Sequence, residues 1–214
     1  MYIHCMLRLF VNPDAVRPDD LEPAVRALRT GGVVAFPTET FYGLAADPRS
    51  QQGVKKIFSV KQRPSDQSLP LIAASVEQVA DHVGAMTPLA TRLASRAWPG
   101  PLTLIIPASP LLCEDLHRST GTVAVRVPGA SLARLLASSA GHAITSTSAN
   151  FSGEPPASIP DQVAAMLGDR IDVLIDAGRT PGGLPSTIVD ATGDEPVLVR
   201  AGAIAWERVL EFLR

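Results

Sequence analysis

The chain has 214 residues, of which 46% are hydrophobic, 19% charged and 5% aromatic, and its formal net charge is −2. That length and apolar content fit one compact domain with a large core, predicted to cover residues 1–214. The near-neutral charge excludes a protein that coats nucleic acid with its whole surface, and the low aromatic content argues against a binder that stacks single-stranded bases.

The first half of the chain alternates short apolar runs with helical patterns. The first helix is expected to be capped by Asp19 or Asp20 and to end near Thr30. Residues 33–36 are fully apolar, as in a sheet covered on both faces, and Pro37 is expected to end their regular pairing. Strands are predicted at residues 7–11, 33–36, 41–46, 69–74 and 102–106, and further helices at residues 50–60, 76–83 and 88–98.

The second half continues the alternation. Strands are predicted at residues 122–127, 143–146, 173–176, 187–190 and 197–200, and helices at residues 130–139, 161–167 and 206–213. This pattern predicts an α/β fold with a mixed sheet. The segment 176–186 is rich in glycine and proline, which fits either a mobile loop or an ordinary connection.

The two cysteines, Cys5 and Cys113, lie far apart and in no motif, which excludes a disulfide framework and fits a reducing cytoplasm. The N-terminus lacks a charged region followed by a long apolar stretch, so we expect no signal peptide. Residues 97–113 carry no charge, but prolines interrupt them. We therefore expect two loops around a buried strand there rather than a membrane span.

Several common catalytic patterns are absent from the sequence. It contains no glycine-rich phosphate loop, no dinucleotide fingerprint and no Gly-x-Ser-x-Gly elbow. The four histidines do not pair at metal-ligand spacing, and no cysteine pair supports zinc. We therefore predict no protein-held metal site and no histidine-driven nucleophile, and His142 is expected simply to precede a strand.

Lys61 and Arg63 place two cations two positions apart, after a helical pattern. On extended backbone, residues i and i+2 point to the same side, so both side chains can face one anion. Arginine offers a planar fork to phosphate or carboxylate, and lysine a compact charge. A solvated basic loop is the alternative interpretation of these two residues taken alone.

The run Ser146-Thr147-Ser148-Ala149-Asn150 follows a short apolar strand. Hydroxyls, an amide and backbone N–H groups can bind phosphate oxygens without net charge. The alternative is an ordinary turn, since these residue types favour turns. The position after a buried strand favours a ligand site, because open α/β sheets place their ligands at strand ends.

Arg126 lies in the apolar run 123–127, where a buried arginine needs either an internal acid or a bound anion as its partner. Ser186 and Arg200 are further polar residues at predicted strand ends. Glu39 is the one acid in the first predicted loop, and it can orient a cation, orient a ligand amine or cap a turn.

Taken in order, these segments resemble the YrdC-like family of threonylcarbamoyl-AMP synthases. The resemblance spans about residues 20–202, and the family signature Lys-x-Arg followed by Ser-x-Asn is met by Lys61, Arg63, Ser148 and Asn150. The matching stretches are residues 36–44, 61–64, 98–103, 123–126, 146–153 and 185–190. The resemblance implies a twisted, open mixed sheet with flanking helices and a concave, basic active face. It also implies that the extra C-terminal domain of longer family members is absent.

The resemblance further implies a nucleotidyltransferase that joins L-threonine, bicarbonate or CO₂, and ATP into threonylcarbamoyl-adenylate, with Mg²⁺ accompanying ATP. Lys61 and Arg63 are the implied catalytic residues. Threonine would be bound by Thr40, Arg126, Ser146 and Ser186. The nucleotide would be bound by Lys61, Arg63, Thr122, Ser148, Asn150 and Arg200. No ligand contact is assigned in residues 66–72.

The implied product would supply the modification of adenosine 37 in tRNA, so tRNA and tRNA-modification proteins are the expected partners, in the cytoplasm and without a membrane. One alternative is a non-catalytic module that binds tRNA or double-stranded RNA. Another is carbamoyl transfer in hydrogenase maturation, where a related domain occurs together with zinc-finger modules that need more cysteines than this chain has.

Overall fold

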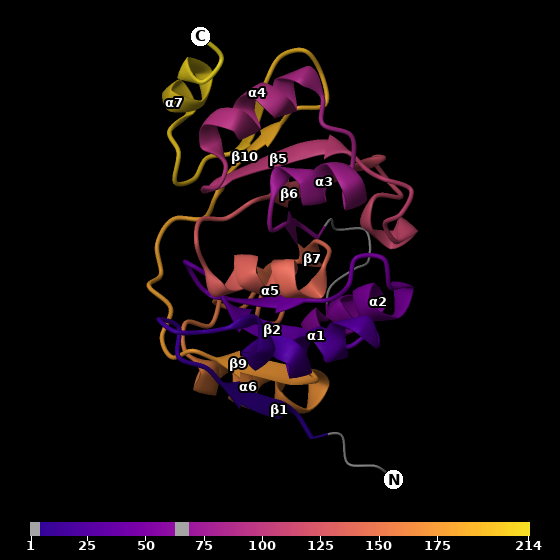
Figure 1. Cartoon of the computed structure of the whole chain (residues 1–214), viewed down its shortest axis with the longest axis vertical. Helices are drawn as coiled ribbons and strands as arrows, with labels where there is room; N and C mark the ends of the chain where they lie inside the picture. The colour runs from indigo at the N-terminus through magenta and orange to yellow at the C-terminus, as the bar shows by residue number, and fades with distance from the viewer. Residues whose placement is uncertain (1–4, 63–68) are drawn as a thin grey trace.

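The computed structural model describes residues 5–62 and 69–214, and the strands in these ranges form two mixed sheets. The five-stranded sheet has the order β1 (Leu7–Phe10), β9 (Val173–Asp176), β2 (Val34–Pro37), β3 (Tyr42–Ala45) and β8 (Thr147–Ser148). The six-stranded sheet has the order β11 (Val197–Arg200), β10 (Thr187–Asp190), β5 (Leu102–Pro107), β6 (Thr122–Arg126), β4 (Leu71–Ile72) and β7 (Ile144–Thr145). In Figure 1, β1, β9 and β2 lie toward the bottom of the molecule and β5, β6 and β10 toward the top. The α/β class with mixed pairing is confirmed, and the strands are divided between two sheets.

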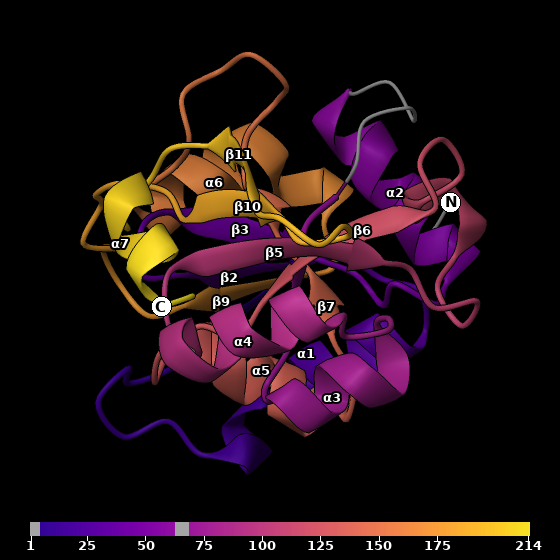
Figure 2. The ribbon, with the colours of Figure 1, turned by 90° about the horizontal axis from the view of Figure 1, so that it is seen from above.

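Every predicted helix is present, and serine or threonine caps four of them. The helices are α1 (Glu22–Arg29), α2 (Gln51–Lys61), α3 (Val76–His82), α4 (Pro88–Ala97), α5 (Leu132–Ala140), α6 (Pro160–Leu167) and α7 (Trp206–Glu211). The hydroxyls of Ser50, Ser75, Thr87 and Ser131 each accept a hydrogen bond from the backbone N–H three residues later, which satisfies a helix donor that would otherwise lack a partner. In the view from above, α3, α4 and α5 gather on one side of β5 and α6 on the other (Figure 2).

The chain crosses between the two sheets at Ser146. The strand predicted at residues 143–146 is shorter than expected: β7 pairs with β4 in the six-stranded sheet, and β8 starts immediately after Ser146 and pairs with β3 in the five-stranded sheet. The backbone N–H of Ser146 donates to the carbonyl of Pro70 at 2.7 Å. The hydroxyl run that the sequence identified therefore lies where the sheets meet.

The core explains why residues 33–36 are apolar without alternation. Val33 and Ala35 belong to one buried cluster, which reaches β5, β6 and α2. Val34 and Phe36 belong to a second cluster, which includes α1 and α5. Because β2 is covered on both faces, every one of these positions excludes polar side chains.

One local prediction needs correction. The first helix begins later than expected, after a 3₁₀ turn at Pro18–Leu21, and Asp20 accepts a hydrogen bond from the backbone N–H of Arg17 instead of capping α1. Pro23 in the first turn favours this start. Its fixed φ suits a helix, and a backbone N–H at this position would have no acceptor within the helix, so its absence costs nothing. Pro37 is the last paired residue of β2, opposite Tyr42, and the predicted loop at residues 38–40 follows it. None of the described helices has the length and apolar character needed to cross a membrane.

Candidate active site

A cavity of about 360 Å³ lies between the two sheets. Tyr42 and Ser148 contribute to its wall from the five-stranded sheet, and Ile72, Ile188 and Arg200 from the six-stranded sheet. Among the predicted site residues, the lining includes Thr40, Arg126, Ser146, Ser148, Ser186 and Arg200. Residues that are distant in the sequence are therefore brought to one cavity.

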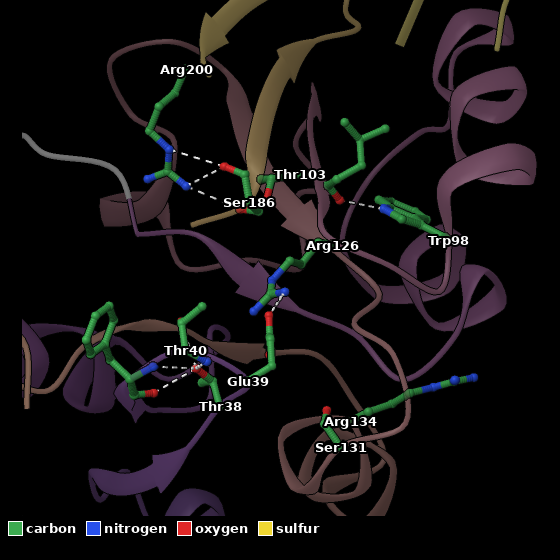
Figure 3. Close-up of polar contacts among 12 residues, drawn as sticks. Thr38, Glu39, Thr40, Trp98, Thr103, Arg126, Ser131, Arg134, Ser186 and Arg200 are labelled. Carbon is green, nitrogen blue, oxygen red and sulfur yellow. Dashed lines mark hydrogen bonds and ion pairs between the residues drawn. The ribbon is translucent and has the colours of Figure 1, made fainter. Parts of the chain in front are cut away.

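The loop between β2 and β3 is held in a tight turn by Thr38. The hydroxyl of Thr38 donates to the carbonyl of Phe41 at 2.7 Å and accepts from the backbone N–H of Thr40 at 3.1 Å. This local bonding is typical of a Ser/Thr turn and fixes the backbone on both sides of Glu39. As a result, Glu39 and Thr40 both line the cavity (Figure 3).

Arg126 is the last residue of β6, and its guanidinium forms an ion pair with Glu39 through Nη1 and Oε1. The Arg126 side chain is 12% exposed and that of Glu39 is 40% exposed. Of the two partners that the sequence left open for this arginine, the structure contains the internal acid. Figure 3 shows the pair in the middle of the site, between Thr40 and Ser186.

Arg200, at the end of β11, binds a different group. Its Nη2 donates to the carbonyl of Ser186 at 2.8 Å and to the Ser186 hydroxyl at 3.2 Å. That hydroxyl also lies 2.7 Å from Oγ1 of Thr103. Burial lowers the pKa of Arg200 from its ordinary value, and the nearby positive charge of Arg126 lowers it further. No described carboxylate forms an ion pair with Arg200, so an anion between the two guanidinium groups would relieve their repulsion.

The sequence suggested extended backbone at Lys61, but the structure has helix there. Helix α2 continues through Lys61 and ends at Gln62, which adopts the left-handed conformation. The Lys61 side chain is only 3% exposed. Nζ lies 2.5 Å from the carbonyl oxygen of Ser148, 3.0 Å from that of Asn150 and 3.2 Å from Oδ1 of Asn150. Lys61 is thus behind the cavity wall, where it holds the Ser148 segment in place. Arg63 lies outside the described residues.

Asn150 and Thr122 are not among the residues that line the cavity. Asn150 is buried, and its amide bonds Lys61 and the carbonyl of Glu154, so it supports the wall from behind. Thr122 begins β6, at the opposite end of that strand from Arg126, and its hydroxyl donates to Thr120 at 2.9 Å. The length of β6 therefore places Thr122 about 13 Å from Arg126.

Thr38 and Thr103 also line the cavity, although neither is among the site residues predicted from the sequence. Thr103 had a usable signal, since it is a polar residue inside the apolar strand β5, as Arg126 is in β6. Thr38 lies in the matching stretch 36–44, but only the three-dimensional turn shows that its hydroxyl holds the loop.

The glycine-rich segment after β9 is bonded to the cavity loop. The backbone N–H of Gly182 donates to the carbonyl of Thr40 at 2.9 Å, and the Tyr42 hydroxyl donates to the carbonyl of Gly178 at 2.7 Å. Gly178, Gly182 and Gly183 have positive φ, which favours glycine at these positions. The segment leads directly into Pro185 and Ser186 of the cavity wall.

The comparisons with known proteins agree on one family. The Sua5/YciO/YrdC model, described as "Telomere recombination", matches residues 26–202. A curated relative from Bacillus subtilis (strain 168), named threonylcarbamoyl-AMP synthase, is 41% identical over 87% of this chain and 54% of its own length. A relative of the same name from Vibrio campbellii is 38% identical over 80% of this chain and 94% of its own length. The chain thus spans about half the length of the first curated relatives that it matches, and nearly all of others.

Solved structures give the same result. Pyrococcus abyssi Sua5, solved in complex with L-threonine, superposes with a TM-score of 0.87 and 35% identity over 97% of this chain and 60% of its own. E. coli YciO superposes with a TM-score of 0.85 and 25% identity over 95% of this chain and 99% of its own.

Proposed function

This chain belongs to the Sua5/YciO/YrdC family, and on that premise we propose that it is an L-threonylcarbamoyl-adenylate synthase. The proposed reaction joins L-threonine, bicarbonate or CO₂, and ATP, and releases pyrophosphate. The observation that carries the proposal is the convergence of Arg126, Arg200 and the four predicted serine and threonine site residues on one cavity between the sheets. The relative solved with L-threonine supports the choice of amino acid.

The proposed chemistry is a nucleotidyl transfer. An oxygen of the threonine carbamate attacks the α-phosphorus of ATP, a new P–O bond forms, and the bond to pyrophosphate breaks. This step needs no protein nucleophile, because positioning and charge neutralisation lower its barrier. A site made of arginine, serine and threonine side chains suits such a reaction.

We assign the residues to two groups within this proposal. Arg126, Thr40, Ser146 and Ser186 hold the threonine, and Arg200 and Ser148 hold phosphate oxygens. Lys61 acts through Ser148, since its Nζ lies 3.5 Å from the hydroxyl of that residue. Arg63 remains a proposed phosphate contact by its position in the signature.

Mg²⁺ is proposed to arrive with ATP. Glu39 is the one carboxylate among the described lining residues, and Arg126 engages it. The described residues contain no group of three or more His, Cys, Asp or Glu side chains that could hold a metal ion. We therefore propose that phosphate oxygens and water, rather than protein side chains, would coordinate Mg²⁺. The bound ion would neutralise phosphate charge.

The product would pass to a partner that transfers the threonylcarbamoyl group to adenosine 37 of tRNA in the cytoplasm. The proposal is tested by pyrophosphate release from the purified chain, with each substrate omitted in turn. Release that requires ATP, L-threonine and bicarbonate together supports it. Salt-sensitive RNA binding without pyrophosphate release would instead favour the non-catalytic module.

A further inference from the structure

Glu39 is an unexpected residue in a cavity built for anions. It is the one acidic side chain among the described residues that line the cavity, where Arg126 and Arg200 supply two positive charges. A ligand that carried only phosphates or carboxylates would be repelled by this carboxylate. Glu39 therefore needs an explanation beyond anion binding.

Fold stability does not explain Glu39. Its side chain is 40% exposed, and an ion pair with so exposed a partner contributes little to stability because water screens it. The backbone of the loop is held by Thr38 rather than by the Glu39 side chain. The Glu39 carboxylate can therefore bind a ligand without disrupting the turn.

The ion pair between Glu39 and Arg126 leaves hydrogen-bonding atoms of both side chains available to a ligand. Among the described residues, Arg126 bonds Glu39 through Nη1 alone, and Glu39 accepts through Oε1 alone. The other guanidinium nitrogens can bind a carboxylate, and Oε2 can accept from an ammonium group. A neighbouring cation and anion complement a molecule that carries a carboxylate and an ammonium group on the same carbon.

We propose that Glu39 and Arg126 together recognise the zwitterionic head group of a free α-amino acid, with Glu39 binding the ammonium and Arg126 the carboxylate. This inference rests on the proposed function and extends it: Glu39 selects ligands that have a free α-amine. The amine is the atom that must be carboxylated in the proposed reaction, so binding it fixes the reacting group in the cavity.

The test measures the affinity of two ligands by titration calorimetry on the full chain. L-threonine is compared with 3-hydroxybutanoate, which has the same carbon skeleton, hydroxyl and carboxylate but no amine. The wild-type chain is expected to bind L-threonine about 10- to 100-fold more tightly, the range of one charge-assisted hydrogen bond. Equal affinities of the wild type for the two ligands would overturn the inference without any variant.

The variant Glu39→Gln keeps the size of the side chain and removes its charge. We expect it to weaken L-threonine binding about 10- to 100-fold and to leave 3-hydroxybutanoate binding equal or tighter, because the repulsion of the carboxylate is gone. The matched control is Glu211→Gln, which breaks the exposed ion pair of Glu211 with Arg208 on α7, outside the cavity. The control should bind both ligands as the wild type does.

The outcomes separate the two proposals. If the wild type does not bind L-threonine, the proposed function fails and the role of Glu39 fails with it. If the wild type binds L-threonine and Glu39→Gln keeps the same ratio of affinities for the two ligands, only the role of Glu39 is wrong. A parallel loss of both ligands would likewise contradict amine recognition, since only L-threonine carries the amine.

Discussion

Arg126 and Glu39 form an ion pair across the cavity, from elements of different sheets. Arg126 ends β6 in the six-stranded sheet, and Glu39 follows β2 of the five-stranded sheet. The two strands lie far apart in the sequence, so the pair depends on how the sheets pack. The pair lies where the two sheets face each other, and each sheet's side of the cavity supplies one of its two charges.

Replacing Arg126 should affect threonine use. Arg126→Ala removes the proposed carboxylate contact, and we expect kcat/KM for L-threonine to fall by about 100-fold or more, equivalent to about 2.7–4 kcal/mol in the barrier. Arg126→Lys should recover little, because lysine lacks the planar fork. The assay is the initial rate of pyrophosphate release against threonine concentration. Arg208→Ala on α7 is the control, and equal kcat/KM in Arg126→Ala and this control would refute the role.

Lys61 should contribute to both stability and turnover. Lys61→Met keeps the length of the side chain but removes the Nζ donor to two oxygens of buried Asn150 and one of the two donors to the Ser148 carbonyl. Such a loss costs about 1–3 kcal/mol per buried group, less where water enters. We expect a lower urea midpoint and slower pyrophosphate release. Lys55→Met, on the exposed face of the same helix, is the matched control. Unchanged stability of Lys61→Met would show that Lys61 does not hold this segment.

A methyl group at Gly202 should displace the backbone that carries Ser186 in the cavity wall. A Cβ there would lie 2.3 Å from the carbonyl oxygen of Pro185 and 2.5 Å from the backbone nitrogen of Thr187, so backbone must move. Overpacking of this kind costs about 1–3 kcal/mol, and it shifts Ser186, which bonds Arg200. Gly202→Ala should therefore raise the KM for ATP as well as lower the melting temperature.

Gly193→Ala is the control for this prediction, because a Cβ at Gly193 would have no neighbour within 4 Å. Its melting temperature and KM should match those of the wild type. The close approach at Gly202 would be unimportant if both glycine variants behaved alike.

His142 should make stability depend on pH. Burial lowers its pKa from the ordinary value of 6.5, although Asp47, whose Oδ2 lies 3.4 Å from Nε2, partly opposes this effect. Above pH 6.5 the imidazole is neutral in both the folded and unfolded states, and its full contribution is present. As pH falls below that value, the unfolded state takes up the proton first, so folding stability falls.

The measurement is the melting temperature between about pH 7.5 and pH 5.5, where carboxylates change little. His142→Gln should have a flatter curve than the wild type over this range. Parallel curves for the two proteins would show that another group governs the pH dependence.

The sequence predicted elements well where local chemistry decides them. The helices predicted at residues 50–60 and 130–139 are both present, where the hydroxyls of Ser50 and Ser131 cap them and Gly141 ends the second with positive φ. The continuous apolar run of β2 correctly indicated burial on both faces. Such features depend on residues close in the sequence.

Other features depend on tertiary packing and could not be predicted from the sequence. The division of strands between two sheets depends on the pairing of β7 with β4 and of β8 with β3, and neither two-residue strand has a periodic pattern. The burial of Lys61 also follows from long-range contact, since its partners lie more than 80 residues away. The sequence showed that Arg126 needs a partner, but only the structure shows that Glu39 provides it.

The most direct test of the proposed synthesis is product analysis by mass spectrometry after incubation of the chain with ATP, labelled bicarbonate and individual amino acids. We expect labelled carbon to enter an acyl-adenylate, and L-threonine to give far more of this product than other amino acids do. Consumption of ATP without transfer of the label, or equal labelling with every amino acid, would contradict the proposed synthesis.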